Sequence, residues 1–108
     1  MPRFRRTGPT RHRKDGNHDE IKDLFMDRGF SWVDIHGLGG GVGDGIAGGY
    51  GENVLIEVKP DTGDPVKMLT DGESKFRKAW RGWHEIVQNE ADVDRVCAEA
   101  IRRGVRSI

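Results

Sequence analysis

The residues best suited to chemistry stand near the middle of the chain, where an expected strand ends. The run 53–59 finishes with Glu57-Val58-Lys59, and Asp44 stands upstream in a glycine-rich segment. Side chains on a strand alternate between two faces, so Glu57 and Lys59 share one face. The other face is apolar and can enter a core; it consists of Val54, Ile56 and Val58. A carboxylate and an ammonium group are therefore expected side by side at the strand end.

Asp44 is expected close to this strand end because it begins a strand predicted at 44–48, which a turn at 49–51 folds back against the next strand. Two carboxylates held side by side repel each other unless a cation lies between them. Their hard oxygen atoms suit Mg²⁺, with Mn²⁺ able to replace it, and the main-chain carbonyl of Val58 could add a third ligand. Lys59 could orient a water and offset charge on a phosphate. The grouping predicts metal-dependent hydrolysis of a phosphodiester bond.

Simpler interpretations compete with this chemistry. A Glu-x-Lys pair at a strand end is commonly a solvated ion pair, and Asp44, which lies beside glycine, is typical of a turn. On that interpretation the protein is a non-catalytic nucleic-acid-binding module. A nucleotide cofactor is not expected: residues 43–48 fit G-x-G-x-x-G, but no helix is predicted after them and no Lys-Ser/Thr pair follows.

The elements expected around these residues are three helices and four strands. Apolar residues at helical spacing predict helices at about 17–29, 70–82 and 91–103. Short apolar or alternating runs predict strands at about 30–36, 44–48, 53–59 and 84–88. The order α-β-β-β-α-β-α predicts an α/β fold with a mixed four-stranded sheet flanked by helices. In that sheet the fourth strand is expected to run parallel to its neighbour.

The first two helices each begin with a capping-box pattern. Asn17 stands three residues before Glu20, and Thr70 stands three residues before Glu73. Glu20 could cap the first helix, or it could complete the metal site from that helix. The two roles do not exclude each other.

The formal net charge is zero, yet the charges are unevenly distributed. Residues 1–14 contain six basic residues and no acid, which leaves 12 Lys and Arg against 18 Asp and Glu in the rest of the chain. We therefore expect a flexible basic arm over 1–16 and a single domain over 17–108, with the arm contacting the backbone of a nucleic acid. The arm residues expected to do so are Arg3, Arg5, Arg6, Arg11, Arg13 and Lys14.

The second helix carries a further basic set. Lys75, Lys78 and Arg81 recur at helical spacing. They could contact phosphates of DNA, or they could form an ordinary solvated surface.

The composition also bears on the compartment. With one cysteine, Cys97, the chain cannot form an intrachain disulfide, which fits a reducing compartment. No apolar run is long enough to cross a membrane, and the basic N-terminus is not followed by the apolar stretch of a secretory signal. We therefore expect a cytoplasmic protein with no membrane partner.

The motif residues together resemble a known superfamily. Gly43-Asp44 followed by Ile56-Glu57-Val58-Lys59, after a helix that bears Glu20, resembles the PD-(D/E)XK nucleases. The segments 69–73 and 80–82 make the chain similar to the small stand-alone phage and bacterial nucleases of the VRR-NUC group. Archaeal-type Holliday junction resolvases share the same core and often carry a basic N-terminal stretch. The resemblance extends over about residues 17–100.

This resemblance implies a restriction-endonuclease-like core. In it Asp44 and Glu57 would bind the metal, Lys59 would serve the nucleophile and Glu20 would complete the site. It further implies an endonuclease that cuts DNA, in particular branched DNA such as a Holliday junction, as a homodimer whose two sites cut opposing strands. A restriction or toxin-like nuclease would differ only in substrate. Gly43 stands where the superfamily usually has Pro, and Glu73 stands where the VRR-NUC group usually has Gln.

Overall fold

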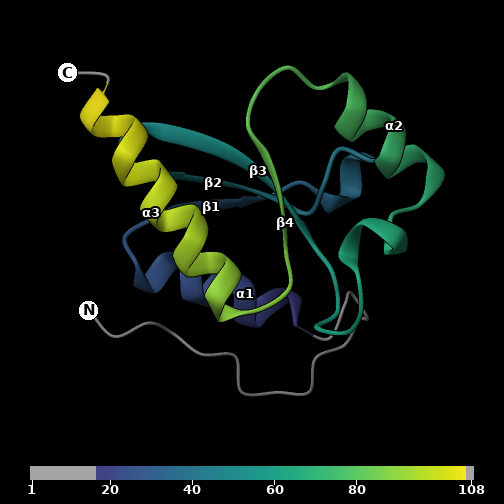
Figure 1. Cartoon of the computed structure of the whole chain (residues 1–108), viewed down its shortest axis with the longest axis horizontal. Coiled ribbons are helices and arrows are strands. Elements are labelled where there is room, and N and C mark those ends of the chain that lie inside the picture. Colours follow the sequence, from purple (N-terminus) through teal and green to yellow (C-terminus); the bar gives the residue numbers. More distant parts are fainter. Residues whose placement is uncertain (1–16, 107–108) are drawn as a thin grey trace.

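The computed structural model describes residues 17–106, and its elements follow the predicted order (Figure 1). The helices are α1 (His18–Asp27), α2 (Asp71–Ala79) and α3 (Glu90–Arg106). The strands are β1 (Ser31–Asp34), β2 (Gly45–Gly49), β3 (Glu52–Val58) and β4 (His84–Val87). Two short 3₁₀ helices, η1 (His36–Leu38) and η2 (Pro65–Met68), follow β1 and β3. The basic arm expected over 1–16 lies outside the described residues.

The four strands form one mixed sheet in the order β1-β2-β3-β4. β1, β2 and β3 are antiparallel neighbours, and β4 runs parallel to β3, as predicted for a crossover through a helix. The β2–β3 hairpin turns through Tyr50 and Gly51, whose φ angles are 58° and 79°. Two successive positive φ angles define the type I′ turn that suits a two-residue hairpin. This turn pairs Gly49 with Glu52 and thereby sets the register of the whole hairpin.

The main core lies between one face of the sheet and the helices α1 and α3 (Figure 1). The apolar face of β3 belongs to this core, as the alternation of residues 53–59 predicted. Burying one large apolar side chain contributes about 1.5–3 kcal/mol, so this layer supplies most of the stability of a small domain. Its fully buried members are Ile21, Phe25, Ala47, Val54, Ile56, Val58, Val87, Val93, Val96 and Ala100.

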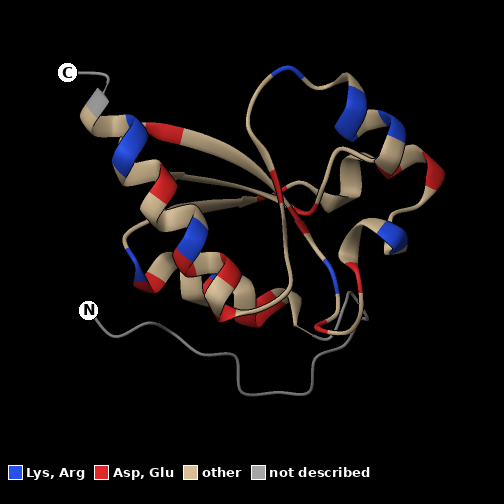
Figure 2. Ribbon diagram, viewed as in Figure 1, with Lys and Arg blue, Asp and Glu red and all other residues tan. Residues whose placement is uncertain are grey.

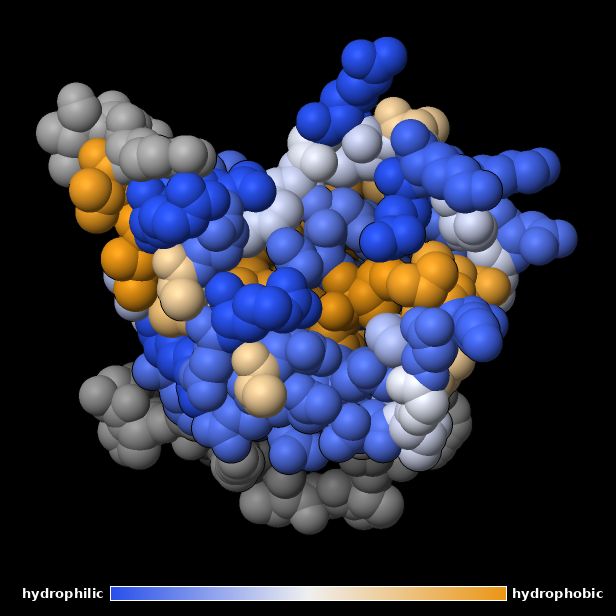
Figure 3. Space-filling model, viewed as in Figure 1, coloured by the Kyte–Doolittle hydropathy of each residue, from blue (hydrophilic) through white to orange (hydrophobic). Residues whose placement is uncertain are grey.

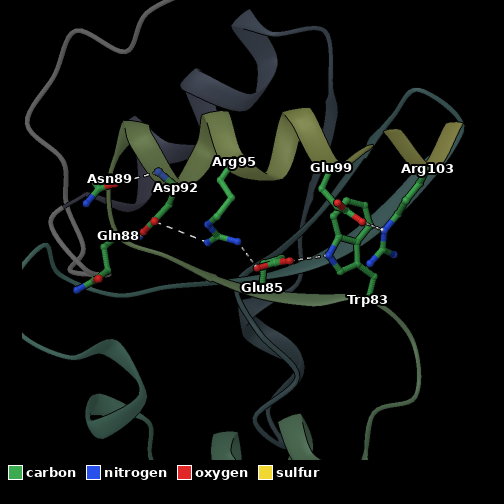
Figure 4. Close-up of polar contacts among 8 residues, drawn as sticks. All are labelled: Trp83, Glu85, Gln88, Asn89, Asp92, Arg95, Glu99 and Arg103. Carbon is green, nitrogen blue, oxygen red and sulfur yellow. Dashed lines mark hydrogen bonds and ion pairs between the residues drawn. The ribbon is translucent and has the colours of Figure 1, made fainter. Parts of the chain in front are cut away.

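Polar contacts fasten α3 to β4 along the length of the helix (Figure 4). Glu85 accepts hydrogen bonds from the indole N–H of Trp83 (2.7 Å) and from Arg95 (2.8 Å). Arg103 lies over the Trp83 ring, with its guanidinium carbon 3.9 Å from the ring centroid. At the start of the helix, the Asn89 side chain caps the N–H of Asp92 (3.0 Å). These contacts hold β4, the strand at one edge of the sheet, against α3.

Some sequence expectations about the helices are wrong. α2 ends at Ala79, so Trp80 lies beyond the helix, where its side chain is 45% exposed. None of the residues of α2 itself is buried. α3 continues past Gly104 to Arg106. A Cβ atom at Gly104 would lie 2.7 Å from the carbonyl oxygen of Tyr50, so this glycine lets the helix approach the hairpin turn instead of ending it. Ile101 is spaced for the inward side of α3, next to the buried Ala100, yet it is 43% exposed near the end of that helix.

The charged residues are unevenly placed on this frame (Figure 2). Asp and Glu predominate along α1, whereas Lys and Arg gather on α2 after its first turn.

Among residues 17–106, no helix combines the length and the apolar character needed to cross a membrane.

Candidate metal-binding active site

Asp44 lies next to the end of β3 and immediately before β2, which begins at Gly45 and not at Asp44 as expected. The last β2–β3 pair is Gly45 with Ile56, and the N–H of Asp44 donates to the Ile56 carbonyl (2.8 Å). The negative charge of Asp44 acts on Glu57, so the two carboxyl groups lie near each other. Because Ile56 and Val58 point into the main core, the Glu57 side chain points to the other face of the sheet.

Asp44 is held firmly by the backbone around it. Its Oδ2 accepts the N–H of Val58 at 2.7 Å, a charge-assisted hydrogen bond. Its carbonyl accepts the N–H of Ile35 at 3.0 Å. In a strand, the N–H and C=O of one residue point to the same edge, so the Val58 carbonyl also points toward the Asp44 side. The segment just before β2 and the end of β3 thus each offer oxygen atoms, from Asp44 and from this carbonyl.

Glu57 is a buried carboxyl group with an unusual proton affinity. Its exposed fraction is 4%, the lowest of the acidic residues near the sheet end. Burial, followed by the negative charges of Asp44 and Glu73, raises the pKa of Glu57 to about 9. The charge of Lys59 acts in the opposite direction but does not outweigh them. Without further positive charge, the folded protein therefore keeps Glu57 protonated at neutral pH.

Lys59 lies between two acids at the end of β3. Its Nζ is 3.4 Å from Oε2 of Glu57 and 2.9 Å from Oε1 of Glu73. Burial tends to lower the pKa of Lys59, but its hydrogen bond to Glu73 and the charges of Glu57 and Glu73 outweigh burial and raise this pKa. Lys59 is consequently an ammonium group at neutral pH. It can donate hydrogen bonds and offset negative charge, but it cannot act as a base.

Glu73 is a member of the site that the sequence motif does not include. It forms the predicted capping box of α2: its Oε1 accepts the N–H of Thr70 (2.9 Å), and its own N–H donates to the Thr70 hydroxyl (3.1 Å). Burial opposes ionisation, but the hydrogen bonds from Thr70 and Lys59 lower the pKa of Glu73. The capping-box pattern predicted the contact between Glu73 and Thr70 from the sequence. The contact between Glu73 and Lys59 depends on where α2 lies against the sheet.

The glycine-rich loop before Asp44 packs closely against this site. At Gly41 (φ 73°), a Cβ atom would lie 2.4 Å from the carbonyl oxygen of Gly72 in the first turn of α2. At Gly43 (φ 120°), it would lie 3.1 Å from the Ile56 carbonyl and 4.0 Å from Oε1 of Glu57. A proline could not adopt this φ at Gly43. The glycines let the loop pass between α2 and β3.

Glu20 is not joined to this group. It is exposed in the first turn of α1, and within residues 17–106 it makes no hydrogen bond or ion pair with Asp44, Glu57 or Lys59. The predicted capping box is also absent, because the amide of Asn17 donates to the carbonyls of Lys59 (3.0 Å) and Gln88 (2.9 Å) instead. The Asn17 side chain thus ties the start of α1 to the ends of β3 and β4. The prediction that a capping box begins the first helix is therefore wrong. The role of Glu20 in the metal site stays a prediction.

Only some of the residues expected to contact DNA lie in the described part of the chain. Lys75 and Lys78 are exposed on α2, while Arg81 is exposed beyond the end of that helix and so does not share its face. Trp80 also lies there, stacked on Phe76 with ring centroids 5.2 Å apart. Figure 3 shows apolar residues visible between hydrophilic ones on one side of the molecule. The six arm residues lie outside the described part of the chain.

Comparisons with known proteins do not assign this chain to a family. No family model matches the chain, and neither a curated protein nor a solved structure matches it.

Proposed function

We propose that this protein is a metal-dependent endonuclease that hydrolyses phosphodiester bonds in DNA. The observation that carries the proposal is the grouping of Asp44, Glu57 and Lys59 at the end of β3: Asp44 Oδ2 accepts the N–H of Val58 at 2.7 Å, and Lys59 Nζ lies 3.4 Å from Oε2 of Glu57. The sheet order and the strand directions are those expected of a restriction-endonuclease-like core, which supports the same assignment. These two acids and this amine are the residues to which the resemblance to the PD-(D/E)XK nucleases assigns metal binding and assistance to the nucleophile.

The residues present fit a hard divalent cation such as Mg²⁺ or Mn²⁺. Asp44, Glu57 and the carbonyl of Val58 would hold it, because they supply oxygen atoms from neighbouring strands and leave room for water. The buried Glu57 carboxyl, crowded by two other acids, is the feature of the structure that a bound cation would satisfy. The chemistry that such a cation supplies when bound is neutralisation of phosphate charge and activation of water.

Lys59 would act on the reacting phosphate as a hydrogen-bond donor. As an ammonium group at the end of β3, it can orient a water and offset negative charge that develops on the phosphate. Its contact with Glu73 would hold it in place for this role. Glu73 is therefore a positioning residue in the proposal.

The proposed substrate is branched DNA, such as a Holliday junction, cut by a homodimer. The support comes from charge: exposed Lys75 and Lys78 on α2 lie on the helix that bears Glu73, and the basic sequence 1–14 adds six positive charges. A small domain offers little surface to enclose a duplex, and two symmetry-related sites would cut opposing strands.

The experiment is a cleavage assay on the full chain with a labelled four-way junction and a linear duplex of the same sequence. We expect products with Mg²⁺ or Mn²⁺ and none with EDTA. Asp44→Asn and Lys59→Met should each lower the rate on the order of 10²-fold or more, with DNA binding retained. Asp71→Asn and Lys67→Met, at exposed positions, are matched controls that should cut normally.

The outcome that contradicts the proposal is binding without cutting on every DNA form in both metals. That result would instead identify a non-catalytic nucleic-acid-binding module. Equal cutting of the junction and the linear duplex would keep the nuclease and reject the branched substrate.

A further inference from the structure

A group of metal-binding side chains lies elsewhere in the fold. His18, Asp34 and His36 each offer one ligand atom, and these atoms lie within 4.8 Å of one another. The three residues come from three elements: the start of α1, the end of β1 and the start of η1. Ligand atoms around one ion at bond lengths of about 2.0–2.2 Å lie roughly 3–4 Å apart, so small side-chain rotations would close the site.

This group is separated from the carboxylate site by the sheet. Asp34 pairs with Gly45, and Trp32 pairs with Ala47, a core residue beneath α1 and α3. Asp34 therefore belongs to the core face of the sheet, whereas Glu57 belongs to the other face. An ion held by His18, Asp34 and His36 would be a different ion from the one proposed above.

The environment of the group suits ligation. The indole N–H of Trp32 donates to Oδ1 of Asp34 (2.7 Å), which fixes the carboxylate in the way that outer hydrogen bonds orient metal ligands. His18 is 1% exposed and meets the rings of Trp32 and His36 edge-on, with centroids 6.1 Å and 5.8 Å away. Asp34 and His36 are exposed, so an ion and its waters could enter from solvent.

One cation already competes for the carboxylate. Lys22 Nζ lies 3.4 Å from Oδ2 of Asp34, and both side chains are partly exposed. An exposed ion pair of this kind contributes little, typically below about 1 kcal/mol, so a divalent ion can displace the ammonium group.

We propose that His18, Asp34 and His36 form a binding site for a transition-metal ion of the Zn²⁺ class. Two imidazoles and one carboxylate select such an ion over Mg²⁺, which prefers oxygen ligands alone. The bound ion joins α1 to η1, and η1 leads into the glycine loop that ends at Asp44. The site therefore stabilises the base of that loop.

The test uses the full chain, stripped of metal and titrated with Co²⁺ in excess Mg²⁺, with visible absorption and Zn²⁺ competition as readouts. We expect one Co²⁺ per chain, displaced by Zn²⁺, and a higher melting temperature with Zn²⁺. His36→Gln and Asp34→Asn change exposed residues and should weaken binding at least about tenfold. They should also abolish the rise in melting temperature.

Matched controls remove histidines and acids elsewhere. His84→Gln changes a histidine on the other face of the sheet, His12→Gln changes one in the N-terminal sequence, and Asp44→Asn disables the carboxylate site. All three should bind Co²⁺ as the unaltered chain does. Absence of stoichiometric binding would overturn the proposal, and so would Co²⁺ absorption that survives His36→Gln and Asp34→Asn unchanged.

Discussion

The Nζ atom of Lys59 lies 2.9 Å from Oε1 of Glu73, the same oxygen that accepts the N–H of Thr70 at the start of α2. One carboxylate therefore serves both as a helix cap and as the partner of the lysine in the candidate active site. This contact links α2, which buries none of its own residues, to the end of β3. The position of the helix and the orientation of Lys59 are thereby coupled.

The two roles of Glu73 can be separated by mutation. Thr70→Ala removes half of the capping box and should lower the free energy of unfolding by about 1 kcal/mol, with cleavage little changed. Glu73→Ala removes the cap and the Lys59 contact, so it should cost more stability and also reduce the cleavage rate. Urea denaturation and the junction assay measure the two effects. Equal cleavage by both variants would show that Glu73 is only a cap.

The raised pKa of Glu57 predicts an unusual dependence of stability on pH. The folded protein holds this proton up to about pH 9, whereas the ordinary value of a glutamate is 4.5. Between these values the folded state binds more protons than the unfolded state, so the contribution of Glu57 to the free energy of unfolding falls as the pH rises. Its slope is on the order of 1 kcal/mol per pH unit.

The comparison that isolates this effect is between the unaltered chain and Glu57→Gln, both in EDTA. The stability of the unaltered chain relative to Glu57→Gln should decrease steadily from about pH 5 to pH 9. Urea denaturation at several pH values measures it. A constant difference across this range would show that Glu57 titrates normally.

Asp44→Asn should separate stability from activity. The Asn oxygen can still accept the N–H of Val58, and at neutral pH the protonated Glu57 carboxyl carries no charge for Asp44 to repel. In EDTA at neutral pH we expect this variant to keep the stability of the unaltered chain to within about 1 kcal/mol, although it should not cut DNA. Asp44→Ala, which loses the acceptor, should be destabilised by about 1–3 kcal/mol. Denaturation midpoints in EDTA would contradict this prediction if Asp44→Asn lost as much stability as Asp44→Ala.

The glycine loop offers a matched pair of substitutions. Gly40 and Gly41 have similar φ angles, 70° and 73°, so alanine at either position carries a backbone strain of about 1–2 kcal/mol. Only at Gly41 does the added Cβ meet other atoms, 2.4 Å from the Gly72 carbonyl oxygen; at Gly40 nothing lies within 4 Å. Gly41→Ala should therefore lose more stability and more cleavage activity than Gly40→Ala. Thermal denaturation and the junction assay provide the comparison.

Much of the sheet could be predicted from the sequence because its determinants are local. The alternation over 53–59 distinguishes the core face of β3, and the turn at Tyr50-Gly51 requires φ angles that fix the β2–β3 register. The register ends at the pair of Gly45 with Ile56, and Asp44, expected to begin the strand, lies just before β2. The element order and the parallel fourth strand also follow from the spacing of short segments.

Other features depend on contacts between segments that are distant in the sequence. Asn17 has the residue type of a helix cap, yet its amide is drawn to the strand ends at Lys59 and Gln88, where two carbonyls need donors. Trp80 has the spacing of a buried stripe, but α2 ends before it. Neither outcome is visible in local propensity, because both depend on where the helices lie against the sheet.

The sequence by itself determined that Glu57 and Lys59 share one face of β3, because side chains along an extended backbone must alternate between the two faces of the sheet. Only the tertiary structure decided that Glu73 would reach Lys59 and that His18 would meet Asp34 and His36. Those meetings join residues on separate elements, and the packing of helices on the sheet sets their distances.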